Sequence, residues 1–262
     1  MRFESLPKFL ALIALLAPSK ALAWGAEGHE IVAAIALREL TPVARQEVGR
    51  LLGGPVMMVH DASWADEIRD SRPETGAWHY VDIPLWAGSY DAQRDCGNGD
   101  CVVAQIGDDL RVLFNRRAPD AVRAEALRFL IHFVADVHQP LHAEDNDDKG
   151  GNQVHLRLGR ERASLHKLWD VDVVEPLGPD PDAIAESIER NLSPDQRQDW
   201  QSALRRAGPT KPMRSHASTS IPRLAARTSC GCRAIMRSGK RRWRRFFWPR
   251  LGYGWPGCSI RL

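Results

Sequence analysis

The segment AEALRFLIHFVADVHQPLH, residues 124 to 142, decides the fold prediction. Apolar residues occur on nearly every face of a helix drawn through residues 124 to 139, which is typical of a helix buried in a protein core. Pro140 would end it because proline has no backbone N–H. The same helix carries His132 and Asp136, whose four-residue offset makes both side chains project from one face. A buried His–Asp pair is costly to desolvate without a compensating partner, so this helix is a candidate for a metal site.

The surrounding sequence is also helical in pattern. Residues 28 to 40 have helical apolar spacing, and Thr41 followed by Pro42 predicts the start of another helix with Thr41 as its cap. Residues 181 to 192 begin a helix with the same kind of signal, an Asp next to a Pro. Strand signals are sparse, and the alternating segment at 152 to 158 predicts one arm of a short hairpin. The sequence therefore predicts an all-α domain with a short β-hairpin.

Residues 1 to 23 have the pattern of a secretory signal peptide. A positively charged start precedes a short apolar core at residues 9 to 17, and residues 21 to 23 form a small-x-small cleavage site. The apolar core is too short to span a bilayer. We therefore expect cleavage before Trp24 and a secreted or periplasmic product without a membrane anchor.

Two of the five cysteines, Cys96 and Cys101, bracket the polar, Gly-rich segment CGNGDC. In an oxidising compartment this spacing favours a disulfide. A metal site at this pair is the weaker alternative, because the neighbouring residues are acidic and no second cysteine pair lies nearby.

Further histidines and aspartates stand at spacings that suit metal ions. His166 and Asp170 repeat the four-residue offset of His132 and Asp136. Zinc binds imidazole nitrogens and carboxylate oxygens, and a helical pair of this kind offers two ligands without a loop to order. The other candidate ligands are His29, Asp66, His79 and His142. We expect three other histidines either to support a metal ligand without binding the metal or to lie on the surface: His138, His155 and His216.

Six motifs, in their order along the chain, resemble the trinuclear-zinc single-strand nucleases, the family of the fungal single-strand-specific nucleases and the plant bifunctional nucleases. The motifs are WGAEGH, ASWAD, WHYVDIP, HFVADVHQPLH, GGN and LHKLWD, and they extend from residue 24 to about residue 175. Six motifs in order are a specific signal, unlike a single HxxxD pair. The resemblance implies the helical fold that these nucleases share with zinc-dependent phospholipase C.

The resemblance also implies three Zn²⁺ ions. The first would be held by Asp66, His79, His132 and Asp136. The second would be held by His142, His166 and Asp170. The third would be held by His29, by Asp136 as a bridging ligand, and by the α-amino nitrogen and carbonyl oxygen of Trp24. A peptide nitrogen inside a chain has no lone pair to donate, so cleavage before Trp24 would complete this site.

The implied activity is that of a secreted zinc-dependent endonuclease, a monomer that cleaves single-stranded DNA and RNA to 5′-phosphate products and also hydrolyses 3′-nucleotides. Asp66 would orient the attacking water, and Arg69 would neutralise charge on the phosphate. Tyr80 would stack on a base and Asp82 would hydrogen-bond to it. Asn152 would contact phosphate or orient a ligand. The alternatives are a zinc-dependent phospholipase C, or an inactive frameshifted relic with a basic nucleic-acid-binding tail.

The tail raises that last alternative because its composition differs from the rest of the chain. Residues 200 to 262 contain 15 Lys and Arg and no acid, whereas all 33 acidic residues precede them. Aromatic side chains within this segment, at Trp243, Phe246, Phe247 and Trp248, suit a nucleic-acid-binding arm.

A shifted reading frame explains the tail better. The resemblance stops near residue 208, and a shifted frame through the codons of residues 253 to 260 permits the family's usual ending, Leu-Arg-Leu-Ala-Gly-Leu-Leu-Asn. We infer a frameshift near residues 207 to 213. The expected organisation is a signal peptide at 1–23, a nuclease domain at 24–207, and a disordered basic tail at 208–262.

Overall fold

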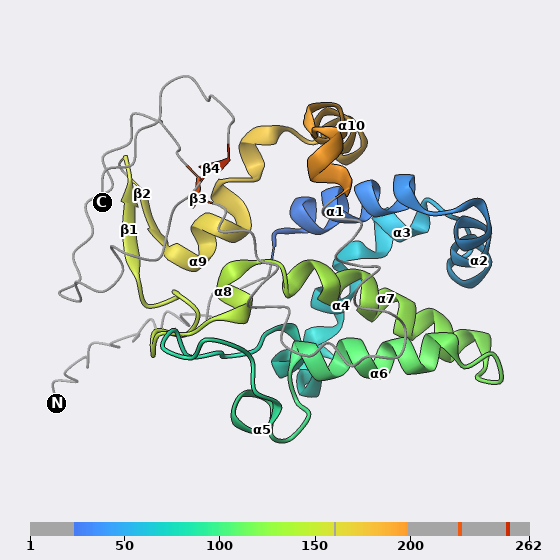
Figure 1. The fold of residues 1–262 in the computed structure, drawn as a ribbon, viewed down its shortest axis with the longest axis horizontal. Coiled ribbons are helices and arrows are strands. Elements are labelled where there is room, and N and C mark those ends of the chain that lie inside the picture. Colours follow the sequence, from blue (N-terminus) through green and yellow to red (C-terminus); the bar gives the residue numbers. More distant parts are fainter. Residues whose placement is uncertain (1–23, 160, 199–224, 227–249, 252–262) are drawn as a thin grey trace, which may run out of the picture.

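The computed structural model describes residues 24–159 and 161–198, together with residues 225–226 and 250–251 (Figure 1). The expected signal peptide lies outside the described residues, and so does the expected tail apart from those four residues. They form two short parallel strands, β3 (Ala225–Ala226) and β4 (Arg250–Leu251).

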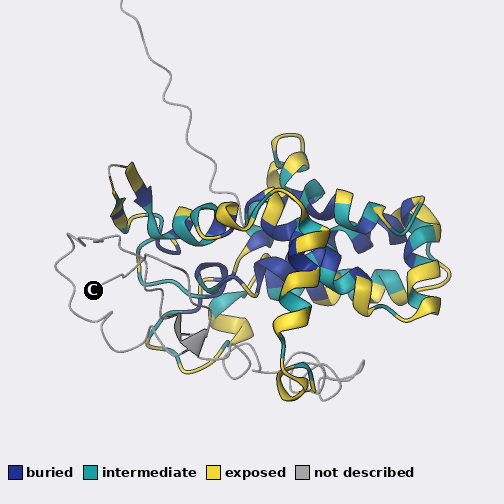
Figure 2. Cartoon of the chain, turned by 90° about the horizontal axis from the view of Figure 1, so that it is seen from above, coloured by how far each residue is buried: buried dark blue, intermediate teal, exposed yellow. Residues whose placement is uncertain are grey.

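The described chain is mostly helical, as the sequence predicts, and the central helix is α7 (Asp120–Asp136). Helix α7 begins before the predicted start, and it lies beside α6 (Val102–Phe114) along much of its length (Figure 1). Phe129 and Phe133 of α7 pack with Val102 and Ile106 of α6 in one core cluster. Figure 2 shows the buried residues concentrated along the middle of the helical body. The His132–Asp136 pair at the end of α7 is therefore held in a rigid apolar frame.

Two further helices have the predicted start signals. Helix α1 (Ala26–Glu39) is followed by α2 (Pro42–Leu52), where the Thr41 hydroxyl accepts a hydrogen bond from the Ala44 N–H at 3.2 Å. Helix α10 (Pro181–Asn191) starts in the same manner, because the Asp180 carboxylate accepts from two backbone N–H groups. Helices α1 and α10 pack against each other through a small apolar cluster. This packing fixes the direction from which α1 approaches the end of α7.

Short elements connect these helices. The α-helical ones are α3 (Met57–His60), α4 (Trp64–Glu67), α5 (Ala92–Asp95), α8 (Pro140–Ala143) and α9 (Leu165–Lys167). The 3₁₀ turns are η1 (Asp61–Ser63), η2 (Ile68–Asp70), η3 (Pro73–His79) and η5 (Glu175–Leu177), and the π turn is η4 (Leu168–Asp172). Because Gln139 caps α8 and Pro140 occupies its first position, this proline begins a helix as well as following one.

The predicted hairpin is formed by β1 (His155–Leu158) and β2 (Glu161–Ser164), which pair antiparallel with Leu156 opposite Ala163. Cys96 and Cys101 form a disulfide, which confirms that prediction over a metal site at the pair. His138 and His155 are exposed, as expected, whereas His216 lies outside the described residues. Among the described residues, every helix falls short of the length and apolarity that crossing a membrane requires.

Candidate metal centre

At the end of α7 a buried imidazole nitrogen faces a buried carboxylate. His132 and Asp136 are both fully buried. His132 Nδ1 lies 2.7 Å from the Ala62 carbonyl oxygen, and since a carbonyl can only accept, Nδ1 carries the proton. In a neutral ring Nε2 carries no proton, and it faces Asp136 Oδ2 at 3.3 Å; although burial opposes it, the Asp136 carboxylate raises the pKa of His132. A lone pair opposite a carboxylate oxygen requires a cation or an added proton between them.

Asp66 from α4 and His79 from η3 complete this group of four side chains. His79 Nδ1 lies 3.0 Å from Asp136 Oδ2 and 3.1 Å from His132 Nε2. The two carboxylate oxygens of Asp66 lie 3.7 Å from His79 Nδ1 and 3.7 Å from His132 Nε2. Asp66, His79 and His132 therefore bring ligand atoms within 4.8 Å of one another, and Asp136 contacts the same two histidines, consistent with the set that the resemblance implies for the first metal.

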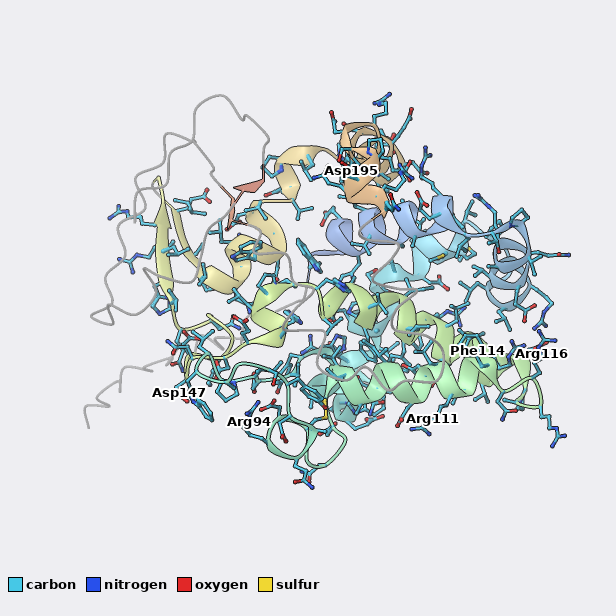
Figure 3. The ribbon with its side chains drawn as sticks, in the orientation of Figure 1. Arg94, Arg111, Phe114, Arg116, Asp147 and Asp195 are labelled. Atoms are coloured by element: carbon cyan, nitrogen blue, oxygen red, sulfur yellow. A yellow bond between two sulfur atoms is a disulfide. The ribbon has the colours of Figure 1, made fainter. Side chains whose placement is uncertain are left out.

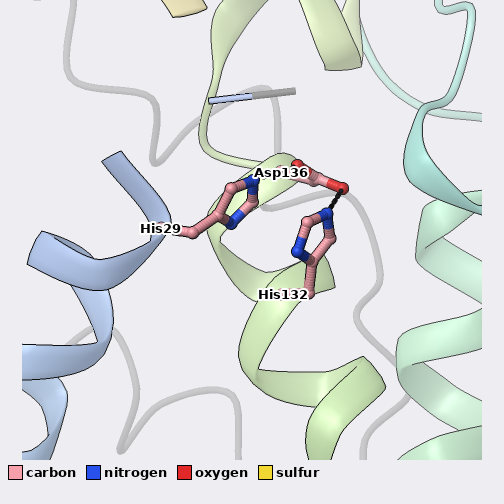
Figure 4. Close-up of side chains that lie close together, drawn as sticks. All are labelled: His29, His132 and Asp136. Carbon is pink, nitrogen blue, oxygen red and sulfur yellow. Dashed lines mark ion pairs between the residues drawn. The ribbon is translucent and has the colours of Figure 1, made fainter. Parts of the chain in front are cut away.

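His29 from α1 approaches the other oxygen of Asp136. Its ring stacks on His132 with centroids 3.7 Å apart, and its Nε2 lies 3.4 Å from Asp136 Oδ1 (Figure 4). One oxygen of Asp136 thus faces His79 and His132, and the second faces His29. This division is the geometry expected of a carboxylate that bridges two cations.

Trp24 is anchored beside these residues. Its indole Nε1 donates to the Ala135 carbonyl at 3.1 Å, and the next residue, Gly25, donates its N–H to the Asp170 carbonyl at 2.7 Å. The absence of a side chain at Gly28 lets Trp24 fold back on α1, because a Cβ there would lie 2.8 Å from the Trp24 Cβ. The backbone at residue 24 is thereby tied to the end of α7 and to η4.

A second group consists of His142 on α8, His166 on α9 and Asp170 on η4, all buried. The Nδ1 of His142 donates to the His79 carbonyl at 2.8 Å, and the Nδ1 of His166 donates to the Gly150 carbonyl at 2.7 Å. Their Nε2 atoms lie 3.2 Å apart, and Asp170 Oδ2 lies 3.1 Å from His166 Nε2. These three ligand atoms also converge.

Two residues support this second group in ways that the sequence does not predict. The fully buried Gln139 donates its amide to Asp170 Oδ1 at 2.5 Å and accepts the Leu141 N–H at 2.6 Å. Gly150 has a φ of 55°, and a Cβ there would lie 2.5 Å from the Leu141 carbonyl oxygen. The motifs HQPLH and GGN contain both residues, but their partners become visible only in three dimensions.

Buried atoms without partners fit a metal at these positions. His29 Nε2 and Asp136 Oδ1, which face each other, are both buried and make no hydrogen bond. Burial lowers the pKa of His29 well below its usual value, and burial together with His142 lowers the pKa of His166 to about 4. Burial raises the pKa of Asp170 to about 8. Neutral imidazoles beside carboxylates that need a compensating charge are the donor set that zinc prefers.

The predicted substrate residues border the first group. Arg69 Nη1 donates to Asp66 Oδ1 at 3.1 Å. Tyr80 directly follows His79 and is 42% exposed, and Asp82 is exposed as well, whereas Val81 between them is buried. Asn152 donates its amide to the Lys149 carbonyl at 2.9 Å, within the loop whose Gly150 holds His166.

The fold and the three His and Asp groups define a helical protein with candidate metal ligands. Residues 24–229 match the family described as S1/P1 nuclease. Endonuclease 2 of Arabidopsis thaliana is 30% identical over 205 residues, covering 70% of this chain and 70% of that protein. Nuclease P1 of Penicillium citrinum is 33% identical over 163 residues, covering 59% of each chain, and nuclease S1 of Aspergillus oryzae is 31% identical over 160 residues.

The chain therefore belongs to the S1/P1 nuclease family, whose members are zinc-dependent hydrolases of phosphodiester bonds. This confirms the family resemblance and the fold class, but the match extends to residue 229, beyond residue 208 where the sequence analysis placed the end of the resemblance. The chain spans less than two thirds of the length of nucleases P1 and S1, at 59% and 55%.

Proposed function

We propose that this chain, processed to begin at Trp24, binds three zinc ions and hydrolyses phosphodiester bonds in single-stranded DNA and RNA and the phosphate of 3′-nucleotides. The observation that carries the proposal is the position of Asp136, whose two oxygens face different histidines at 3.0 Å and 3.4 Å. The ligand sets are those given by the resemblance: Asp66, His79, His132 and Asp136; His142, His166 and Asp170; and Trp24, His29 and Asp136.

When bound, zinc supplies Lewis-acid activation of water and of the phosphate. The residues of the chain orient the reactants around it. The Asp66 carboxylate, with its side chain 9% exposed, orients a water molecule and accepts its proton. Arg69 is held beside Asp66 by their ion pair, so that its guanidinium neutralises charge on the phosphate during attack.

The exposed face of the segment after His79 is suited to a base. Tyr80 presents its ring for stacking, and the Asp82 carboxylate accepts hydrogen bonds from base edges. A base in a duplex is already stacked and paired, so this contact selects single strands. Asn152 contacts the phosphate from the loop beside His166.

The proposal includes export and a nuclease domain at residues 24–207. Cleavage of the signal peptide before Trp24 places the protein in the periplasm or outside the cell, as a monomer. The basic tail from residue 208 is attributed to a shifted reading frame, and resequencing across the codons of residues 205–215 tests that attribution.

The experiment compares the chain beginning at Trp24 with two matched histidine variants. His132→Ala removes a buried candidate ligand, whereas His138→Ala removes an exposed histidine from the same region. We expect zinc in the unsubstituted chain by elemental analysis, and faster cleavage of a single-stranded oligonucleotide than of its duplex. His132→Ala should reduce cleavage by more than about a hundredfold, and His138→Ala should retain it. Hydrolysis of phosphatidylcholine without cleavage of single-stranded DNA would overturn the proposal.

A further inference from the structure

Among the Trp, Tyr and Phe residues that the structure describes, Trp86 is the most exposed, at 74%. Trp24, Trp64 and Trp78 are packed against core clusters instead. An indole exposed to water contributes little of the stabilisation that its burial would give. Trp86 is also not one of the candidate metal ligands. Its surroundings indicate a binding role.

The backbone fixes Trp86 relative to Tyr80. Leaving the centre, the chain pairs with α8 and the segment that follows it, because the Val81 N–H donates to the His142 carbonyl at 2.8 Å and the Leu85 N–H donates to the Asp145 carbonyl at 3.1 Å. A turn follows, in which the Ala87 N–H donates to the Pro84 carbonyl at 2.8 Å. Trp86 lies within this turn, at the end of the ribbon that begins at Tyr80.

Arg94 supports one face of the Trp86 ring. Its guanidinium carbon lies 5.5 Å from the ring centroid. Arg94 is itself fixed, since it donates to Asp95 at 2.6 Å and to the Ser89 carbonyl at 2.7 Å. With 74% of the residue exposed, the indole retains a face open to solvent. The result is an exposed aromatic face with a cation on its other side.

We propose that Trp86 stacks on a base of the single-stranded substrate beyond the base held at Tyr80, forming a second base-binding subsite. The inference rests on the proposed function, and it adds a residue that favours longer substrates. Because six residues separate Tyr80 and Trp86, their Cα atoms lie at most about 20 Å apart, so a short single strand that contacts Tyr80 can also reach Trp86. Stacking on an aromatic ring is tolerant of base identity, so the subsite would select for length and not for sequence.

The local charges favour stacking over phosphate contact as the source of binding. Asp95 is paired with Arg94, and Asp91 accepts the backbone N–H groups of Gln93 and Arg94 at the start of α5. Both carboxylates therefore already have partners, and the positive charge of Arg94 is largely compensated by the negative charge of Asp95. The expected dependence of the subsite on salt is therefore weak.

The test uses zinc-loaded protein beginning at Trp24 and three variants. Trp86→Ala removes the ring, and Trp86→Phe keeps an aromatic face. Phe114→Ala is the matched control, because Phe114 is 70% exposed and lies toward the end of the molecule away from Arg94 (Figure 3). The dissociation constant is measured by fluorescence anisotropy for a cleavage-resistant phosphorothioate oligonucleotide. Hydrolysis of a 3′-mononucleotide is measured in parallel.

We expect Trp86→Ala to weaken oligonucleotide binding by about 5- to 100-fold, the effect of losing one base–aromatic stack. Trp86→Phe should recover most of that loss, and Phe114→Ala should bind as the unsubstituted chain does. Hydrolysis of the mononucleotide should be unchanged in all three, because it does not reach Trp86. An unchanged dissociation constant in Trp86→Ala, or equal weakening in Phe114→Ala, would overturn the inference. Binding that depends on Trp86 in a protein that cleaves no phosphodiester would refute the proposed function and leave the subsite standing.

Discussion

His142 Nε2 and His166 Nε2 face each other at 3.2 Å, while the Nδ1 of each ring donates to a backbone carbonyl. Both rings are neutral in this arrangement, so two lone pairs point at one another. Lone pairs at this distance repel unless a cation or a proton lies between them, and burial holds the pKa of each ring below its usual value. A bound cation resolves the conflict, and the backbone carbonyls orient both rings for it.

Replacing Gln139 with leucine should weaken zinc binding at the group that contains Asp170. The Gln139 amide holds one oxygen of this carboxylate, and outer-sphere partners of this kind contribute about 10- to 100-fold to metal affinity. The measurement is zinc affinity by competition with a chelator, together with the midpoint of thermal unfolding. Gln153→Leu, in an exposed position nearby, is the control. Equal zinc affinity for both variants would show that Gln139 serves only the backbone of α8.

Asp136→Asn should remove more metal than the loss of any other single ligand. The substitution keeps the size of the side chain but takes the charge from a group that faces His29, His79 and His132. We expect elemental analysis to show the loss of up to two zinc ions, and the midpoint of thermal unfolding to fall because zinc binding is linked to folding. Asp195→Asn, at an exposed position after α10 (Figure 3), should change neither quantity. Full zinc content in Asp136→Asn would contradict the bridging assignment.

Asp109 on α6 should make the protein less stable as the pH rises. Burial, with help from Asp108 and Glu125, raises the pKa of its carboxyl to about 7, and its Oδ2 is buried without a hydrogen-bond partner. The unfolded chain has the ordinary Asp pKa of about 3.9. Between these two values the folded state binds more protons, so the free energy of unfolding falls as pH rises toward 7 and is flat above it.

The variant Asp109→Asn removes this pH dependence. We expect its midpoint of thermal unfolding to exceed that of the unsubstituted chain by about 2–4 °C at pH 8, the effect of ~1 kcal/mol in a domain of this size after allowance for partial exposure. At pH 4 the difference should vanish. Glu186→Gln, an exposed position on α10, provides the control. A constant difference across this pH range would mean that Asp109 is not the titrating group.

Local sequence signals were sufficient to predict much of the fold. Thr41 with Pro42, and Asp180 with Pro181, mark helix starts because capping depends on atoms a few residues apart. The start of α7 was predicted too late, since its first turn at Asp120 is exposed and lacks the apolar spacing that identified the rest. Helical periodicity reports burial, and an exposed first turn gives no such signal.

In the candidate site, too, the features set by local spacing were predicted and the features set by tertiary contacts were not. The His132–Asp136 pair follows from α-helix geometry, and the structure also brings together His166 and Asp170, although this second pair runs from α9 into the π turn η4. The roles of Gln139 and Gly150 were not predicted, because their partners, Asp170 on η4 and His166 on α9, lie far along the chain. Which carbonyl accepts each Nδ1–H, and therefore which ring nitrogen is bare, is likewise a tertiary property.

The most direct measurement of the central claim is the zinc content of one protein before and after its amino terminus is freed. A fusion with a protease site directly before Trp24 holds the Trp24 nitrogen as an amide, which cannot ligate a metal. Cleavage converts it to an α-amine with an ordinary pKa of about 7.7–8.0, from which a nearby dication displaces the proton.

The indole contact to Ala135 and the Gly25 contact to Asp170 already hold residue 24 beside the centre. We predict two zinc ions per chain and little turnover of single-stranded DNA before cleavage, and three zinc ions with a large rise in turnover afterwards. Three zinc ions and full activity in the uncleaved fusion would contradict the claim that the free amino group of Trp24 completes the site.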